Sequence, residues 1–162
     1  MAGKLVDRAG GRECPESSSQ PAENQVSDNP GSAESLVDDR ASVLIIDDDP
    51  MHLRIYGWIL DAAGYEARPA LVVGAAIDFP EGRVDLVVMD YRLTGQLTAV
   101  EAAEATKARY PQAPIVVLSD VYDLPADIAP YAEAFVRKGE PAKLVDTLAR
   151  CVGQAGRRGS VA

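Results

Sequence analysis

The amino-acid sequence predicts an α/β fold, in which five parallel strands form one doubly wound sheet with helices on both faces. Two observations lead to this prediction. Several short, continuous apolar runs lack the alternation of a half-exposed strand, which is typical of strands buried on both faces. Segments with helical character separate these runs, as right-handed crossovers between parallel strands require. The strands are expected near residues 43–46, 66–68, 85–89, 115–118 and 134–137.

Capping and breaking residues place the helices between these strands. Asp49 followed by Pro50 is typical of an N-cap and a first helical position, and Gly64 ends the helix that they begin. An alanine-rich helix is expected over residues 99–109, where Pro111 stops it. The remaining helices are expected around residues 72–78, between residues 125 and 130, and from residue 141 onward. Numbered along the chain, the strand order that we expect is 2-1-3-4-5.

Composition divides the chain into one domain and two tails. Residues 1–40 contain no aromatic residue and few large aliphatic ones, so they cannot bury enough apolar area to offset the entropy of ordering. We expect them to form a disordered N-terminal tail. The domain is expected over residues 41–153, and residues 154–162, rich in Gly and Arg, are expected to be a frayed C-terminal tail. Because no output domain is expected in these tails, the domain is expected to act through a protein partner.

Charge and cysteine content argue against several functions. The net charge of −9 opposes binding to nucleic acids and to anionic membrane surfaces, which both need clustered basic residues. Cys14 and Cys151 are too few to form a disulfide framework. No apolar run approaches the length of a membrane span, and the N-terminus lacks the hydrophobic segment of a signal peptide. These features predict a cytoplasmic protein that binds neither nucleic acid nor membrane.

Chemically reactive residues follow four of the predicted strands. Because the carboxyl ends of parallel strands meet at one edge of the sheet, and ligands bind where the strand order reverses, we expect these side chains to converge there. Any one of them would be an ordinary turn, cap or surface residue, and only their occurrence together points to a site. They are Asp47, Asp48 and Asp49 after the first strand, Asp90 after the third, Ser119 after the fourth and Lys138 after the fifth.

Several carboxylates in one pocket predict a metal site, because they repel one another and need a cation to remain ionised together. Oxygen ligands with no His or Cys nearby favour a hard ion, Mg²⁺ before Zn²⁺. The chain has one histidine, His52, which lies in the first turn of a predicted helix and which we do not expect to act as a catalytic base. One carboxylate is then free to attack phosphorus and form an acyl phosphate, with Lys138 and Ser119 contacting the phosphoryl oxygens.

With these motifs the sequence resembles the receiver domain of bacterial two-component response regulators, of the stand-alone single-domain type. The resemblance covers about residues 42–152 and implies a flavodoxin-like fold. The motifs that carry it are Leu44-Ile45-Ile46-Asp47-Asp48-Asp49-Pro50, Asp85-Leu86-Val87-Val88-Met89-Asp90-Tyr91-Arg92-Leu93, Val117-Leu118-Ser119 and Phe135-Val136-Arg137-Lys138.

The resemblance implies a phosphorelay function centred on Asp90. Asp90 would accept a phosphoryl group from the phosphohistidine of a sensor histidine kinase or a histidine phosphotransfer protein. Ser119 and Lys138 would contact the transferred group, and Phe135 would be an aromatic switch that signals to a downstream protein target. The domain would then be no enzyme, since it would assist only its own phosphorylation and dephosphorylation.

The resemblance also implies which groups bind the metal ion. Asp47 and Asp48 would hold Mg²⁺ together with Asp90, and Asp48 would be the more direct ligand of the first two. The backbone carbonyl of Arg92 would complete the protein ligands.

The sequence departs from the family's pattern in four places. A threonine, Thr94, replaces the usual proline four residues after the phospho-acceptor, and Thr98-Ala99 replaces the usual Asp-Gly before the third helix, with one apparent insertion. A carboxylate, Asp120, replaces the small residue after Ser119, and Gly139 replaces the proline after the lysine. The residues that carry the acceptor chemistry are all retained.

Two alternatives belong to other functional classes. A haloacid-dehalogenase-like phosphatase would use Asp47 as its nucleophile, but it would leave Asp90 without a role. A receiver-like binding scaffold that is never phosphorylated would have no need to keep Asp47, Asp48, Asp90, Ser119 and Lys138.

Overall fold

The structure of the protein is a computed structural model that describes residues 40–158. Residues 1–39, and with them nearly all of the tail predicted to be disordered, lie outside the described residues, as do residues 159–162. The described elements are β1 (Ser42–Asp47), α1 (Pro50–Ala62), β2 (Glu66–Val73), β3 (Ala76–Ile77), β4 (Leu86–Asp90), α2 (Ala99–Arg109), β5 (Ile115–Ser119), β6 (Ala132–Arg137) and α3 (Pro141–Arg158).

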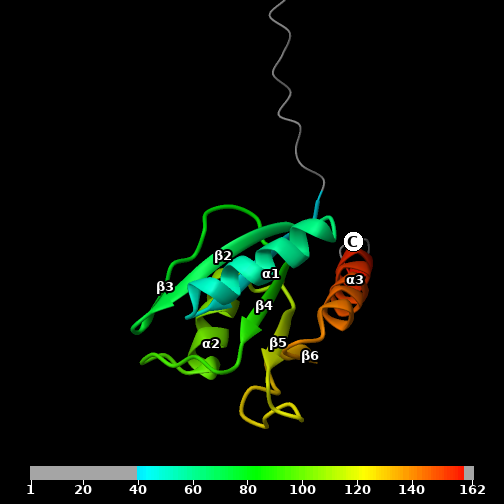
Figure 1. Ribbon diagram of the computed structural model, residues 1–162. Coiled ribbons are helices and arrows are strands. Elements are labelled where there is room, and N and C mark those ends of the chain that lie inside the picture. The colour runs from blue at the N-terminus through cyan, green and yellow to red at the C-terminus, as the bar shows by residue number, and fades with distance from the viewer. Residues whose placement is uncertain (1–39, 159–162) are drawn as a thin grey trace, which may run out of the picture. The chain divides into compact units, whose positions relative to one another are not determined.

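One sheet with the order β3-β2-β1-β4-β5-β6 organises the domain (Figure 1). Strands β2, β1, β4, β5 and β6 are parallel to one another, so the five predicted strands occur in the predicted order 2-1-3-4-5. The sheet has one strand more than expected, because the two-residue β3 pairs antiparallel with the end of β2. Strand order reverses between β1 and β4, where the site was expected.

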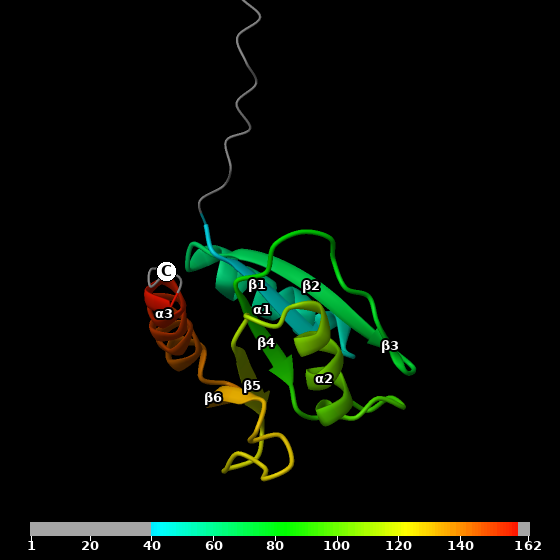
Figure 2. The ribbon, with the colours of Figure 1, turned by 180° about the vertical axis from the view of Figure 1, so that it is seen from behind.

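Alternate residues of the buried strands pack into two apolar cores, one on each face of the sheet. Leu44 and Ile46 of β1 belong to the core under α2, and Val43 and Ile45 belong to the core under α1 and α3. Figure 1 shows α1 and α3 on the near side of the sheet. Figure 2, which is the view from behind, shows α2 on the opposite face. Helices therefore cover both faces of the sheet, as predicted.

The prediction of a helix around residues 72–78 is wrong. Val72 pairs with Ile77 and Val73 pairs with Ala76, so the chain forms a tight antiparallel hairpin. The turn contains Gly74 with a φ of 62°, a conformation that L side chains rarely adopt. The β-branched residues that end β2 favour continued extension, and the segment is too short for a stable helix.

The short helix predicted between Pro125 and Pro130 is also absent, so the described residues contain three helices where five were predicted. The segment forms turns, with a bond from the Ala129 N–H to the Pro125 carbonyl (3.2 Å). The backbone conformations that proline imposes on itself and on the preceding residue interrupt a helix of this length. Ile128, fully buried, anchors the segment to the core beside α2.

The helix boundaries predicted from capping signals are mostly confirmed. Asp49 accepts a hydrogen bond from the Met51 N–H at the start of α1, and Gly64, with a φ of 86°, follows the helix. Helix α2 spans the predicted residues 99–109, and its N-cap is Thr98, which was not predicted as a cap and which forms a capping box with Glu101. Helix α3 continues to Arg158, whereas the C-terminal tail was expected to begin at residue 154.

Candidate functional site

The predicted site residues meet at the carboxyl edge of the sheet. Asp47 ends β1 and Asp90 ends β4, and both stand one residue beyond the paired residues Ile46 and Met89. Ser119 ends β5, and the Lys138 N–H, just past β6, donates to its carbonyl (2.7 Å). A cavity of about 540 Å³ opens here; its lining residues are Asp48, Asp49, Pro50, His52, Asp90, Arg92, Thr94, Asp120 and Lys138.

Asp90 is held at the base of this cavity by two donors. Its side chain is 3% exposed, and its Oδ2 accepts a bond from the Lys138 Nζ at 2.7 Å. Its Oδ1 accepts from the backbone N–H of Arg92 at 3.0 Å. Burial opposes a charge on Lys138, but its hydrogen bond and attraction to Asp90, with a contribution from Asp47, raise the pKa of the amine above its usual value. Lys138 therefore remains a cation beside the buried Asp90 carboxylate.

Asp47 lies beside this pair and is equally buried. Its Oδ2 is 3.9 Å from the Lys138 Nζ, and its Oδ1 accepts from the Asp49 N–H at 2.8 Å. Burial raises the pKa of the Asp47 carboxyl, and repulsion from Asp90 adds to this effect; together they outweigh the hydrogen bond and the nearby cations. Two carboxylates thus share one amine in a poorly hydrated place, so the site has an excess of negative charge.

Asp48 points to the rim of the cavity, where Thr94 engages it. The Thr94 backbone N–H donates to the Asp48 Oδ2 at 2.9 Å, and the Thr94 hydroxyl bonds to the same oxygen. Burial would raise the pKa of Asp48, but these two hydrogen bonds lower it overall. A proline at position 94, as the family pattern has it, would lack the backbone donor, so this departure has a structural consequence.

The other two predicted residues of the signalling route lie on β5 and β6. Ser119 is fully buried, and its hydroxyl accepts from the Val121 N–H at 3.3 Å. Phe135 is partly buried and packs against the core on the α2 side of the sheet. The Ser119 hydroxyl is therefore at the carboxyl edge of the sheet but not among the groups that line the cavity, and Phe135 lies on the next strand.

The carboxylate that departs from the family pattern pairs with a residue across the cavity. The Asp120 Oδ1 lies 2.8 Å from the Arg92 Nε, and both residues line the cavity. Both side chains are more than half exposed, so the pair is well solvated and contributes little to stability. Asp120 is thus partly neutralised and does not add a free charge to the buried carboxylates.

His52 is a site residue that the sequence reasoning missed. Its Nδ1 lies 3.2 Å from the Asp47 Oδ2 and 3.8 Å from the Asp49 Oδ2. Asp47, His52 and Asp90 each offer one ligand atom within 4.8 Å of the others. The premise that no histidine is near the carboxylates is therefore wrong, since His52 is the third residue of α1 and that helix begins beside the end of β1. The five-residue spacing between Asp47 and His52 was the available signal.

This donor set fits a divalent cation. Asp47 and Asp90 are buried, and Asp48 on the rim keeps a low pKa, so three carboxylates face one lysine. Arg92, whose carbonyl was predicted to be a ligand, also lines the cavity. A bound cation would relieve the repulsion that raises the pKa of Asp47.

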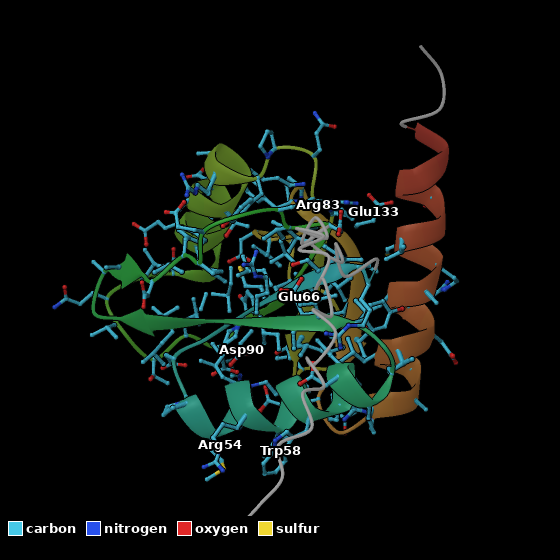
Figure 3. The ribbon with its side chains drawn as sticks, turned by 90° about the horizontal axis from the view of Figure 1, so that it is seen from above. Arg54, Trp58, Glu66, Arg83, Asp90 and Glu133 are labelled. Carbon is cyan, nitrogen blue, oxygen red and sulfur yellow. The ribbon has the colours of Figure 1, made fainter. Side chains whose placement is uncertain are left out.

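The outer face of α1 is an apolar surface beside the cavity. Met51, Ile55 and Trp58 follow one another at helical spacing and are all exposed, Trp58 to 65%. Figure 3 shows Arg54 and Trp58 on the side of α1 turned away from the sheet, with Asp90 on the sheet side. The Arg54 guanidinium lies 5.4 Å from the centre of the Trp58 ring. Ile55 also lines a second hollow of about 460 Å³, which shares His52 and Lys138 with the cavity.

Comparison with known proteins agrees with this architecture. Residues 43–148, more than half of the chain, match the family described as "Response regulator receiver domain", and the chain therefore belongs to that family. None of the curated proteins matches the chain. In the part of the chain that the structure describes, no helix has the length and apolar character needed to cross a membrane.

Solved structures of receiver domains have the same fold. A CheY-like receiver domain protein from Methanospirillum hungatei is 19% identical, with a TM-score of 0.62 over 74% of this chain and 98% of that one. The chemotaxis protein CheY4 of Vibrio cholerae is 25% identical, with a TM-score of 0.57 over 69% and 98% of the two chains. The receiver domain of a histidine kinase from Syntrophus aciditrophicus is 20% identical, with a TM-score of 0.58 over 75% and 97%.

Proposed function

We propose that this receiver domain takes a phosphoryl group onto Asp90 and passes the signal to a protein partner. The observation that carries the proposal is the buried Asp90 carboxylate at the base of an open cavity, 2.7 Å from the Lys138 amine. A carboxylate oxygen of Asp90 would attack the phosphorus of a phosphohistidine. The P–N bond would break, its electron pair would stay on the donor imidazole, and an acyl phosphate would remain on Asp90.

The neighbouring groups support phosphoryl transfer. Lys138 places a positive charge where the phosphoryl oxygens would lie. The buried Ser119 hydroxyl, which lies 3.5 Å from the Asp120 Oδ1, would turn from this long hydrogen bond to donate to the phosphoryl group. Asp47, Asp48 and the Arg92 carbonyl would hold a divalent cation, Mg²⁺ in the first instance, which would screen the incoming phosphate from the carboxylates. The domain would act only on itself, so we propose no enzymatic turnover of another substrate.

The apolar surface of α1 supports a protein phosphodonor. Met51, Ile55 and Trp58 present a stripe that another helix could cover. Ile55 lines the second hollow, which shares His52 and Lys138 with the cavity that contains Asp90. We propose that a histidine kinase or histidine phosphotransfer protein docks there and places its phosphohistidine over the cavity.

We further propose that the signal leaves through Ser119 and Phe135. A new phosphoryl group on Asp90 would draw the Ser119 hydroxyl toward it through a charge-assisted hydrogen bond. Phe135, partly buried on the neighbouring strand, would respond by changing its packing. Residues 120–131 lie between these two and form turns instead of a helix, so the responsive surface consists of this segment and β6.

Labelling with phosphoramidate in the presence of Mg²⁺, followed by mass spectrometry of peptides, tests the proposal. Wild type should carry one phosphoryl group on Asp90, and Asp90→Asn should carry none. Asp146→Asn, which changes an exposed carboxylate on α3, is the matched control and should be labelled like wild type. Label on Asp47 would favour the phosphatase alternative, and a folded wild type that takes no label would favour the binding scaffold.

A further inference from the structure

We propose that His52 is a metal ligand of this chain, so that the site binds late divalent transition metals such as Co²⁺, Ni²⁺ and Zn²⁺ through a nitrogen as well as oxygens. The proposal deepens the function proposed above, because it concerns the metal of the same cavity. It departs from the expectation of an oxygen-only Mg²⁺ site, which assumed that no histidine was near.

The spacing of the ligand atoms suits one shared ion. Two ligand atoms bound at about 2.1 Å from one ion, at angles between octahedral and tetrahedral, lie about 3.0–3.4 Å apart. The His52 Nδ1 and the Asp47 Oδ2 are 3.2 Å apart, which is within that interval. Asp90 contributes an oxygen within 4.8 Å of both, so small side-chain movements would bring three ligands around the ion.

The backbone keeps these ligands near one another before any ion binds. Asp47 and Asp90 end neighbouring buried strands and are 2% and 3% exposed. His52 lies in the first turn of α1, whose start is set by the Asp49 N-cap and by Pro50. The His52 side chain is 40% exposed, so an ion can reach the imidazole from the open cavity without any opening of the core.

The chemistry of the donor set decides which ions benefit. Imidazole is a good ligand for Co²⁺, Ni²⁺ and Zn²⁺, whereas Mg²⁺ prefers carboxylate, carbonyl and water oxygens. The histidine therefore adds affinity for the first group and little for Mg²⁺. In the competing explanation, His52 only donates a hydrogen bond from Nδ1 to Asp47. Replacing His52 would then change the affinity for Mg²⁺ and the affinity for transition metals by the same factor.

Calorimetric titration of Ni²⁺ and Mg²⁺ into the untagged, metal-free full chain separates these explanations. His52→Gln keeps a side-chain donor for Asp47 but removes the imidazole. All proteins carry Cys14→Ser, which prevents the thiol of Cys14 from binding the metal. We expect His52→Gln to lose at least tenfold in Ni²⁺ affinity while its Mg²⁺ affinity changes much less. Equal losses for Ni²⁺ and Mg²⁺, or no loss for Ni²⁺, would overturn the proposal.

A measurement on wild type alone guards against misfolding of the variant. His52 is the only histidine of the chain, so the ¹⁵N signals of its ring give an unambiguous NMR readout. On addition of Zn²⁺, which is diamagnetic, the Nδ1 signal should shift strongly because this nitrogen binds the metal directly, whereas saturating Mg²⁺ should shift it much less. An Nδ1 signal that responds to Zn²⁺ no more than to Mg²⁺ would refute coordination by His52.

The outcome is independent of the function proposed above. Labelling of wild-type Asp90 by phosphoramidate with Mg²⁺ tests that function by itself. If wild type is labelled but Ni²⁺ binding does not depend on His52, only the metal proposal fails. If wild type takes no label but binds Ni²⁺ through His52, only the phosphoryl-transfer proposal fails.

Discussion

Replacing Lys138 with methionine should reveal how much the site depends on one buried ion pair. The Lys138 Nζ lies 2.7 Å from the Asp90 Oδ2 and 3.9 Å from the Asp47 Oδ2, and both carboxylates are 3% exposed. Lys138→Met would therefore leave two buried carboxylates without their main cation. Removing one partner of a buried pair costs about 3–5 kcal/mol, and we expect about 3 kcal/mol because Lys138 is itself 21% exposed.

Urea unfolding in EDTA at pH 7 measures this loss. With a denaturant slope of about 1.5 kcal/mol per M, the midpoint should fall by about 2 M. The matched control is Lys143→Met, because the Lys143–Glu140 pair is exposed and is worth less than about 1 kcal/mol. The double variant of Lys138→Met with Asp90→Asn should regain much of the stability, since it no longer buries the unpaired charge of Asp90.

Addition of Mg²⁺ provides a second arm of the same experiment. A cation that binds the folded site stabilises it in proportion to RT ln(1 + [L]/Kd), and Lys138→Met should gain more than wild type because its carboxylates lack the amine. A loss below about 1 kcal/mol in EDTA would refute the reasoning that Lys138 neutralises buried charge. No recovery in the double variant would refute it equally.

Three further predictions concern the carboxylates, the docking surface and the switch. In EDTA, Asp47→Asn should raise the Tm at pH 7. Burial raises the pKa of the Asp47 carboxyl in the folded state above its ordinary value of 3.8, so folding favours the neutral acid. Wild type therefore loses stability as the pH rises from 3.8 through the folded-state pKa. The gain should vanish in melts below about pH 4, and an equal gain at both pH values would contradict this cause. Trp58→Ala should slow transfer from a phosphohistidine protein at least tenfold in a single-turnover assay, whereas labelling by phosphoramidate is retained; equal slowing of both would argue against docking on α1. Phe135→Ala should weaken capture of the target by the phosphorylated domain more than it reduces labelling of Asp90, and unchanged capture would remove Phe135 from the signalling route.

Removal of Asp48 should have the opposite effect on stability from removal of Asp47. Thr94 donates two hydrogen bonds to Asp48 and lowers its pKa, so folding favours the ionised form. Thermal melts of Asp47→Asn and Asp48→Asn in EDTA at pH 7 should therefore shift the Tm in opposite directions, and shifts of the same sign would contradict this reasoning.

The sequence by itself determined the sheet and its functional edge. The strands at Val43–Ile46 and Ile115–Leu118 are continuous apolar runs, and burial on both faces is enough to specify them. The capping residues Asp49 and Thr98 act within a single turn, so the starts of α1 and α2 can be predicted from local sequence. Once the order of parallel strands was assigned, the meeting of Asp47, Asp90, Ser119 and Lys138 at one edge followed from topology.

Only the tertiary structure decided the contacts that depend on neighbours distant in sequence or on the direction of a side chain. Thr94 reaches Asp48 across 46 residues, and the hairpin at Gly74 and the turns around Ile128 replace two predicted helices. The local sequence pattern could not predict the secondary structure of these two segments, because their proline, glycine and β-branched residues are compatible with several short structures. The imidazole of His52 is the clearest case: its place in the first turn of α1 was predictable, but the direction of its ring, with Nδ1 3.2 Å from the Asp47 Oδ2, was not.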